Sequence, residues 1–175
     1  MCSSDLWDDA GIGGGLSVDI SSTATLSGLT VSGNQARGGD GYAGYNGGSA
    51  YGGGLSVGSR WIWGYPDGTV SSLADSTIDD NFALGGDGGV GGDGGNAYGG
   101  GIFIGGSLGG LTPSLTVSNS SITGNHANGG SGGAGGSDGQ GIGGGVYNLG
   151  TFLYDLATVI ARNHASTGYD NLFTT

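Results

Sequence analysis

The residues of this chain that could do chemistry are few, and its carboxylates come first. All 14 acidic residues are aspartates. Hydrolysis of a glycosidic bond needs two carboxyl groups roughly 5–9.5 Å apart, and Asp79 and Asp80 are the paired candidates beyond the first few residues. Neighbouring side chains of a strand point to opposite faces, and charged side chains are mostly solvated. We therefore interpret this pair as part of a solvated turn and assign no catalytic residue.

A lyase that acts on uronate polysaccharides would need a base and nearby cations. The chain has no lysine, and its three arginines, Arg37, Arg60 and Arg162, fall at unrelated positions. The sequence therefore predicts that the chain is not an enzyme.

Histidines could ligate a metal ion. His126 and His164 occupy one position of a repeat that is described below, but Gln35 and Phe82 occupy it in the other copies. A position that accepts such different side chains is expected to face outward without a metal-binding role. Cys2 is the only cysteine, so no disulfide framework or thiolate site is expected.

Aspartates in glycine-rich segments are the other metal candidates, namely Asp40, Asp87 and Asp93. Stacked oxygen ligands could bind calcium, and these segments partly resemble the calcium-binding GGxGxDxUx repeat. Ala43, however, stands where that repeat has its aspartate. The favoured interpretation is that these side chains solvate the segments. No cofactor is assigned, and weak calcium binding stays as an alternative.

Residues 58–68 are an insertion that the other repeats lack, and it contains Trp61, Trp63 and Tyr65. If this segment is extended, the three rings share one face and could stack on a sugar. The same rings could instead pack over the edge of a coil, which is the commoner fate of large aromatic side chains. Packing is favoured, and a sugar platform stays open.

Composition and charge exclude several classes of protein. The 175 residues include 47 glycines, lack lysine and glutamate, and carry a formal net charge of −11. The two missing residues are strong helix formers, so a helical bundle is excluded. Nucleic-acid binding needs a basic surface, which three scattered arginines cannot provide. No apolar run reaches the ~18 residues of a membrane-spanning helix, and an acidic surface suits an extracellular protein.

Four repeats organise the chain, and each starts with three glycines and an aliphatic residue, beginning at positions 13, 52, 99 and 143. Each repeat then carries a β-type run, an asparagine and, two residues later, an alanine. These columns are Asn34, Asn81, Asn125 and Asn163, and Ala36, Ala83, Ala127 and Ala165. From each of the first three alanines, the stretch that ends on the next glycine triplet spans 19 residues. Such periodicity is typical of solenoids, in which like residues stack.

The fold class predicted is all-β, a right-handed parallel β-helix of about four coils with glycine-rich, polyglycine-II-like insertions. Triplets of Gly-Gly-x match the threefold geometry of such chains, and their constant length favours ordered arms over flexible loops. We interpret residues 1–6 as a sequencing or cloning artefact because they resemble a translated adapter. Residues 7–175 would then be a partial β-helix domain with repeats at about 11–50, 51–97, 98–141 and 142–175, from a longer solenoid.

The glycine triplets and the x-x-Asn motifs resemble the GGA[ILV] and FxxN repeats of polymorphic outer membrane proteins. More broadly, the pattern resembles the β-helical passengers of autotransporters and pectin-lyase-like repeat proteins. The third residue here is glycine, and Val31, Ile78, Ile122 and Ile160 stand where phenylalanine would be. The Gly-Gly-x triplets are also similar in composition to mycobacterial PE_PGRS segments. The resemblance implies a surface-exposed or secreted protein, often an adhesin, and carries no catalytic residues.

Three functional hypotheses follow. The first is a non-catalytic structural or adhesin-like surface module of a bacterial exoprotein, with glycans, host or cell-surface proteins, and further β-helix coils as partners. The second is a fragment of a polysaccharide-active enzyme whose active site lies outside this chain. The third is a calcium-stabilised extracellular spacer.

Overall fold

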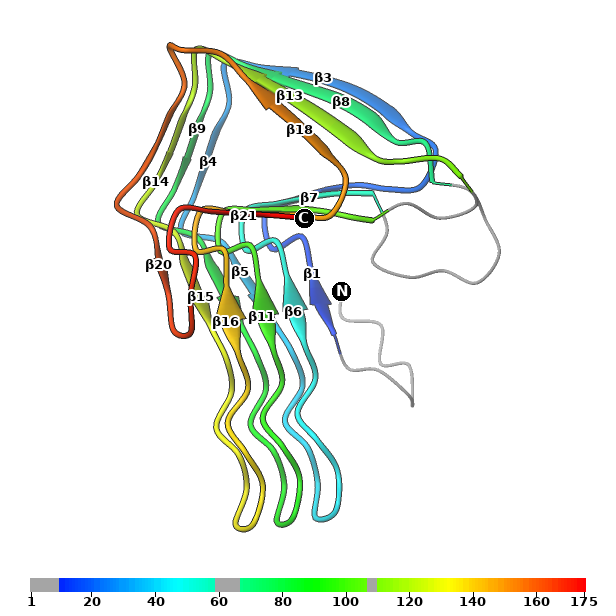
Figure 1. Ribbon diagram of the computed structural model, residues 1–175, viewed down its shortest axis with the longest axis vertical. Coiled ribbons are helices and arrows are strands. Elements are labelled where there is room, and N and C mark those ends of the chain that lie inside the picture. The colour runs from blue at the N-terminus through cyan, green and yellow to red at the C-terminus, as the bar shows by residue number, and fades with distance from the viewer. Residues whose placement is uncertain (1–9, 59–66, 107–109) are drawn as a thin grey trace.

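The computed structural model describes residues 10–58, 67–106 and 110–175, and every helix or strand found there is a β-strand. Strands from successive repeats pair in parallel and in register, so that equivalent residues stack in columns (Figure 1). In the described part of the chain, no helix is long and apolar enough to cross a membrane.

The strands form five parallel sheets, which we call A to E. Sheet A contains β1 (Gly11–Ile12), β6 (Ala50–Tyr51), β11 (Ala97–Tyr98) and β16 (Gly141–Ile142). Sheet B contains β2 (Leu16–Val18), β7 (Leu55–Val57), β12 (Ile102–Ile104), β17 (Val146–Asn148) and β21 (Leu172–Thr174). Sheet C contains β3 (Thr23–Ser27), β8 (Val70–Ala74), β13 (Ser114–Ser118) and β18 (Thr151–Tyr154). Sheet D contains β4 (Thr30–Ser32), β9 (Thr77–Asp79), β14 (Ser121–Thr123) and β19 (Val159–Ala161). Sheet E contains β5 (Gln35–Arg37), β10 (Phe82–Leu84), β15 (His126–Asn128) and β20 (His164–Ala165).

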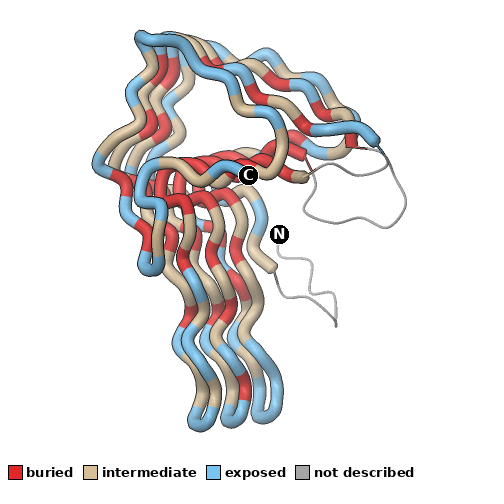
Figure 2. Tube along the Cα trace, in the orientation of Figure 1, coloured by how far each residue is buried: buried red, intermediate tan, exposed pale blue. Residues whose placement is uncertain are grey.

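Sheets B, C and D form the three sides of a coil that encloses the main core (Figures 1 and 2). Alternation along each strand points every second side chain inward, and these inward residues are aliphatic. The core contains Leu55, Val57, Leu73, Ile78, Ile102, Ile104, Leu115, Val117, Ile122 and Val146, each at most 1% exposed. Burial of these stacked side chains is the main source of stability for the coil.

Sheets A and E lie outside the coil, beside sheet B, and contact each other through small side chains (Figure 1). The alanine column of sheet E packs against a second alanine column in sheet A. This cluster contains Ala36, Ala50, Ala83, Ala97, Ala127 and Ala165. A methyl group fills the narrow space between two closely packed sheets, which explains why alanine recurs there.

Aromatic rings fill the space between sheets A and B. Phe103, Tyr147 and Phe173 are stacked neighbours on sheet B, with ring centroids 6.0 and 4.6 Å apart. Tyr51 and Tyr98 stack on sheet A at 5.3 Å, and Tyr51 meets Phe103 edge-on. This second apolar layer fixes the sheets that carry the glycine-rich segments to the coil.

The predicted fold class, an all-β parallel β-helix, is confirmed. The aliphatic residue that follows each glycine triplet is the first residue of a strand, in β2, β7, β12 and β17. The repeat boundaries drawn from the sequence fall inside the two-residue strands β6, β11 and β16. Residues 1–6 lie outside the described residues.

Candidate functional site: the glycine arms

Three twelve-residue arms extend from sheets A and E away from the coil (Figure 1). Arm 1 is residues 38–49, arm 2 is 85–96 and arm 3 is 129–140. Each arm runs outward, turns, and returns beside itself, and the three arms lie side by side as one layer. Figure 2 shows that their exposure is greatest at the turns.

Hydrogen bonds between arms recur every third residue. Four glycines of arm 1 donate their N–H to carbonyl oxygens of arm 2 or of Leu84 just before it, at 2.7–2.9 Å. These donors are Gly38, Gly41, Gly44 and Gly47. Arm 2 repeats this pattern onto arm 3 from Gly85, Gly88, Gly91 and Gly94. A three-residue interval between donors is the geometry expected of a threefold extended chain without internal bonds.

The N–H of the second glycine of a triplet donates either back to the preceding arm or across to the other limb of the same arm. Gly86 and Gly89 donate to carbonyl oxygens of Gly48 and Tyr45 in arm 1, at 2.9 and 3.0 Å. Within one arm, Gly95 donates across to Gly86 at 2.8 Å. Each limb is thus bonded to its partner limb and to the neighbouring arm, so the arms form an ordered lattice.

Glycine is required in the arms because the chains approach too closely for a side chain. A Cβ atom on Gly47 or Gly86 would overlap a backbone carbonyl oxygen of the adjacent arm, that of Gly86 or Gly39 respectively. The same holds for Gly89 and Gly133. The composition of the arms is therefore set by backbone packing, at the cost of the large conformational entropy that glycine loses.

Side chains at the third triplet position bond to the next arm's backbone. The Asp40 carboxylate accepts the N–H of Asp87 at 3.0 Å, and the Asp87 carboxylate accepts that of Ser131 at 2.8 Å. The Asn46 side-chain oxygen similarly accepts the N–H of Asp93 at 2.8 Å, and the Asp93 carboxylate accepts that of Ser137 at 2.8 Å. The polar columns thus satisfy the third amide of the triplet, which has no carbonyl partner.

The pKa of the Asp40 carboxyl lies below its ordinary value of 3.8. The largest cause is the hydrogen bond from the Asp87 N–H, followed by that from the Arg37 guanidinium, whose Nη2 lies 3.0 Å from Oδ1. Both donors stabilise the charged form. Both side chains of this ion pair are more than half exposed, so it contributes little to stability.

Calcium binding by Asp40, Asp87 and Asp93 stays a prediction. One oxygen of each carboxylate already accepts a backbone N–H. Within residues 10–58, 67–106 and 110–175, no group of three histidine, cysteine or acidic side chains is placed to hold a metal ion.

The arms end in tight turns with one residue type in common. Gly44, Gly91 and Gly135 have φ angles of 85°, 80° and 91°, as the third position of a type II turn requires. Arm 1 differs from the others because it carries two exposed tyrosines at its turn, Tyr42 (83% exposed) and Tyr45 (70%).

The predicted asparagine column forms a continuous ladder inside the turn between sheets D and E. The side-chain oxygen of Asn125 accepts both the N–H and the Nδ2 of Asn81, each at 3.0 Å. Its own Nδ2 donates to Asn163 at 2.9 Å and to the Ile78 carbonyl at 2.9 Å. Asn34 begins the ladder, while Asn171, which the repeat pattern did not identify, supplies its last acceptor.

Asp79 and Asp80 line one shallow groove of about 530 Å³ together with Arg162, Thr123 and Val159. β9 ends at Asp79 and Asp80 is in the left-handed region (φ 51°), so the alternation of side chains along the strand does not extend to Asp80. One carboxylate oxygen of Asp79 is buried without a hydrogen-bond partner.

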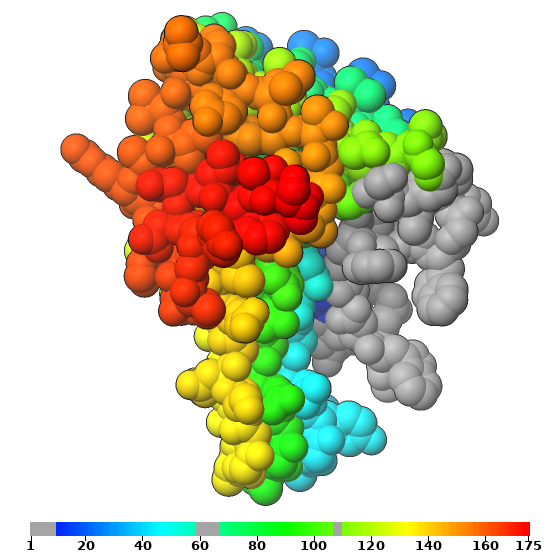
Figure 3. Space-filling view, viewed as in Figure 1, coloured from blue at the N-terminus to red at the C-terminus, as the bar shows by residue number. Residues whose placement is uncertain are grey.

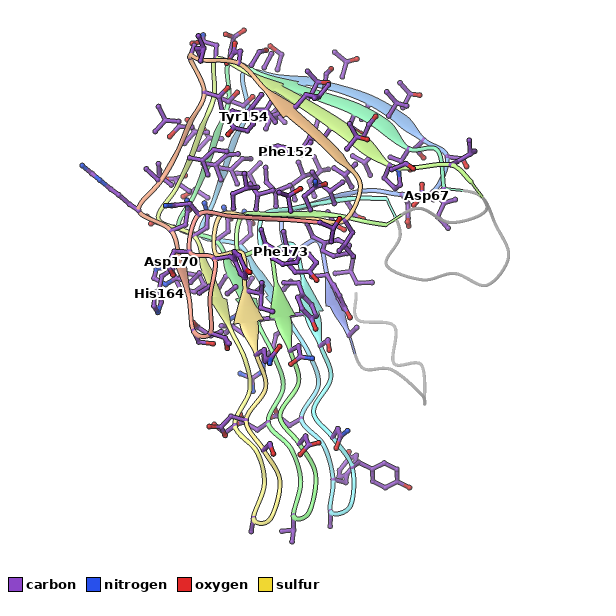
Figure 4. The ribbon with its side chains drawn as sticks, in the orientation of Figure 1. Asp67, Phe152, Tyr154, His164, Asp170 and Phe173 are labelled. Atoms are coloured by element: carbon purple, nitrogen blue, oxygen red, sulfur yellow. The ribbon has the colours of Figure 1, made fainter. Side chains whose placement is uncertain are left out.

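The histidine column lies in register in sheet E. The rings of Phe82 and His126 stack at 5.0 Å, and the His126 and His164 rings meet edge-on at 5.9 Å. His164 is exposed, and its Nδ1 lies 3.5 Å from the Asp170 carboxylate. Figure 4 labels both side chains.

Trp61, Trp63 and Tyr65 lie outside the described residues, so both interpretations of the aromatic insertion stay open. Asp67, near the end of this insertion and labelled in Figure 4, is only 1% exposed. Its carboxylate accepts the N–H and the hydroxyl of Thr69 at 3.1 and 2.6 Å. These bonds fix the turn into β8.

Compared with family models, with curated proteins and with solved structures, the chain matches none.

Proposed function

We propose that this chain is a non-catalytic repeat module of a surface-exposed or secreted bacterial protein, with a structural or adhesin-like role. The observation that carries the proposal is the ordered arm layer. It holds an array of polar side chains and the arm 1 tyrosines away from the coil on a hydrogen-bonded backbone. A rigid, repetitive and acidic surface suits the binding of extended glycans or cell-surface proteins.

The arm 1 turn is the part of this surface best suited to binding. Tyrosine offers a large apolar ring and a hydroxyl at low entropic cost, which is why it is frequent at binding surfaces. Tyr42 and Tyr45 are the first and fourth residues of this turn and are both mostly exposed. The matching positions are glycines in the other arms, Gly89 and Gly92 in arm 2 and Gly133 and Gly136 in arm 3.

Binding of the labelled protein to immobilised glycans and to bacterial and animal cell surfaces tests the proposal. We expect the double variant Tyr42→Ser/Tyr45→Ser to bind about 10-fold more weakly, as loss of central aromatic contacts usually does. Val90→Ser is the matched control, because it changes an exposed apolar residue at the turn of arm 2. Equal binding by the tyrosine variant and the control would refute a role for the arm 1 turn, and no binding to any surface would refute the adhesin-like role.

A polysaccharide-active protein is the second candidate, and the groove beside sheet D is the observation that favours it. Asp79, Asp80 and Arg162 combine two carboxylates with a guanidinium on one surface. Release of reducing ends from polysaccharides, lost in Asp79→Asn and Asp80→Asn, would support this candidate. Absence of turnover by the parent protein would argue against a complete active site in the groove.

A further inference from the structure

Among the described residues, no further arm covers the outer face of arm 3, and the arm lattice stops there. In Figure 3 arm 3 (yellow) forms one edge of the layer, and arm 2 (green) and arm 1 (cyan) follow beside it. A groove of about 460 Å³ lies there, between the limbs of arm 3 and the turn that follows β20. It is lined by Gly129, Gly130, Ser131, Asp138, Gly139, Gln140, Ser166 and Thr167.

Side-chain oxygens on this face take over the role of the next arm's carbonyl groups. In arms 1 and 2, Gly41 and Gly88 donate to carbonyl oxygens of the following arm. The equivalent donor in arm 3 is Gly132, and its N–H is accepted by the Asp138 carboxylate at 2.8 Å. Gly38 and Gly85 likewise donate to the following coil, whereas the equivalent Gly129 donates to the Ser166 hydroxyl at 3.2 Å.

The turn after β20 continues this replacement toward the coil. The N–H of Gly141 donates to the Thr167 hydroxyl at 3.2 Å, whereas Ala50 and Ala97 at its position donate to the next arm. The N–H of Ala165 donates to the Asp170 carboxylate at 2.9 Å.

Asp138 also blocks the face sterically. It occupies the column of Gly47 and Gly94, where a Cβ atom would overlap the carbonyl oxygen of Gly86 or Gly130 in the following arm. A fourth arm of the same shape would meet the same overlap at Asp138. The column is therefore glycine in arms 1 and 2, which a following arm covers, and aspartate in arm 3, where the described residues include no following arm.

We propose that Asp138, Ser166, Thr167 and Asp170 form an edge cap that closes the arm lattice against a further Gly-Gly-x strand, from this chain or from another. An open edge of unpaired backbone groups would template the addition of another such strand, as uncovered sheet edges do. The cap occupies two of the four N–H donors that would bond a further arm, those of Gly129 and Gly132, and it removes the room for a close backbone approach at Asp138.

A chimera tests the steric part of the proposal. Replacing residues 166–171 by a copy of residues 84–101 adds a fourth arm and removes the other three cap residues. We compare this chimera with Asp138 retained, with Asp138→Ala and with Asp138→Gly, by hydrogen exchange of the added arm. Exchange of the buried Ile104 and Val117 amides in the same molecules is the internal reference.

We expect the added arm to be protected in the glycine version alone, by about 10-fold or more over the other two, which corresponds to one bonded lattice contact. Alanine keeps the Cβ and removes the carboxylate, so it separates overlap from hydrogen bonding. Equal protection in all three versions, or none in the glycine version, would overturn the proposal.

The unmodified chain tests the hydrogen-bonding part. Asp138→Ala should speed exchange of the Gly132 amide about 10-fold, whereas Asp138→Asn, which keeps an acceptor oxygen, should change it little. An unchanged Gly132 amide in Asp138→Ala would show that the carboxylate does not cap it.

Discussion

Replacement of Asn125 by alanine removes the central member of the asparagine ladder. Its side chain is fully buried and bonds to four residues, Asn81, Asn163, Ile78 and Thr123. In the variant, the N–H of Asn81 and the carbonyl of Ile78 lose these partners in the interior. Each buried polar group left unsatisfied costs about 1–3 kcal/mol, so the expected loss is about 2–6 kcal/mol, centred near 4.

Asn34→Ala is the matched control, because it removes the same side chain at the half-buried start of the ladder. The Asn34 side chain donates to Ser32 and Asn81, and the Asn81 side-chain oxygen keeps the N–H of residue 34 as a donor. No buried group is orphaned, so the expected loss is about 1 kcal/mol or less.

Urea unfolding followed by circular dichroism measures both variants, with thermal melting as a second readout. A loss of 4 kcal/mol should lower the Tm of Asn125→Ala by about 8–16 °C for a chain of this length. If the two variants differ by less than about 1 kcal/mol, the ladder does not stabilise the solenoid through buried hydrogen bonds, and the reasoning is refuted.

Three further predictions concern the arms and the aromatic layer. Gly89→Ala should push arms 1 and 2 apart and raise amide exchange in both arms by about 10-fold, because overpacking typically costs about 1–3 kcal/mol. Val90→Ala, at the neighbouring residue, should have little effect. Equal exchange in the two variants would contradict close packing at Gly89. If Asp40 and Asp87 bind calcium, the melting temperature should be higher in calcium than in chelator; an unchanged value would eliminate the calcium-stabilised spacer. Burial, followed by the proximity of Tyr51, raises the pKa of Tyr98 above 10.0. The stability that the neutral Tyr98 side chain contributes is therefore complete below pH 10 and is lost as the pH rises through the folded-state pKa of Tyr98. Tyr98→Phe should reduce this loss of stability at alkaline pH, and an equally steep loss in the variant would show that Tyr98 is not its source.

The columns that recur in every repeat could be predicted from the sequence because the solenoid places like residues in like environments. Asn81 and Ala83 were identified from their spacing alone, and both are fully buried. The aromatic layer could not be predicted in this way. Its column runs from Ser56 through Phe103 to Tyr147, so its members share neither size nor polarity along the chain. Only the three-dimensional packing of sheet A on sheet B shows that these positions form one layer.

The edge cap was missed for a related reason. Asp138 departs from a glycine column, and a single departure in a low-complexity segment is indistinguishable from ordinary variation until the direction of its Cβ is known. The constant length of the arms, by contrast, has a structural reason. Hydrogen bonds between arms recur at three-residue intervals, and an insertion in one arm would break their register.

The last acceptor of the asparagine ladder could have been sought in the sequence from the hydrogen-bond donors that need one. Gly145 is the last of a column in which a Cβ atom would collide with the ladder side chain of the same coil, here that of Asn163. Asn171 occupies the next position of that column, beside Leu172, which pairs with Val146. No ladder asparagine follows it among the described residues, so its own side chain fills the vacated space and accepts the N–H and Nδ2 of Asn163, at 3.3 and 3.1 Å. Buried donors must find acceptors. The Asn163 Nδ2 also donates to the Ile122 carbonyl at 3.0 Å, whereas its N–H has Asn171 as its acceptor. That requirement, applied to the residues after Asn163, points to an oxygen-bearing side chain at the position that glycine occupies in the earlier coils.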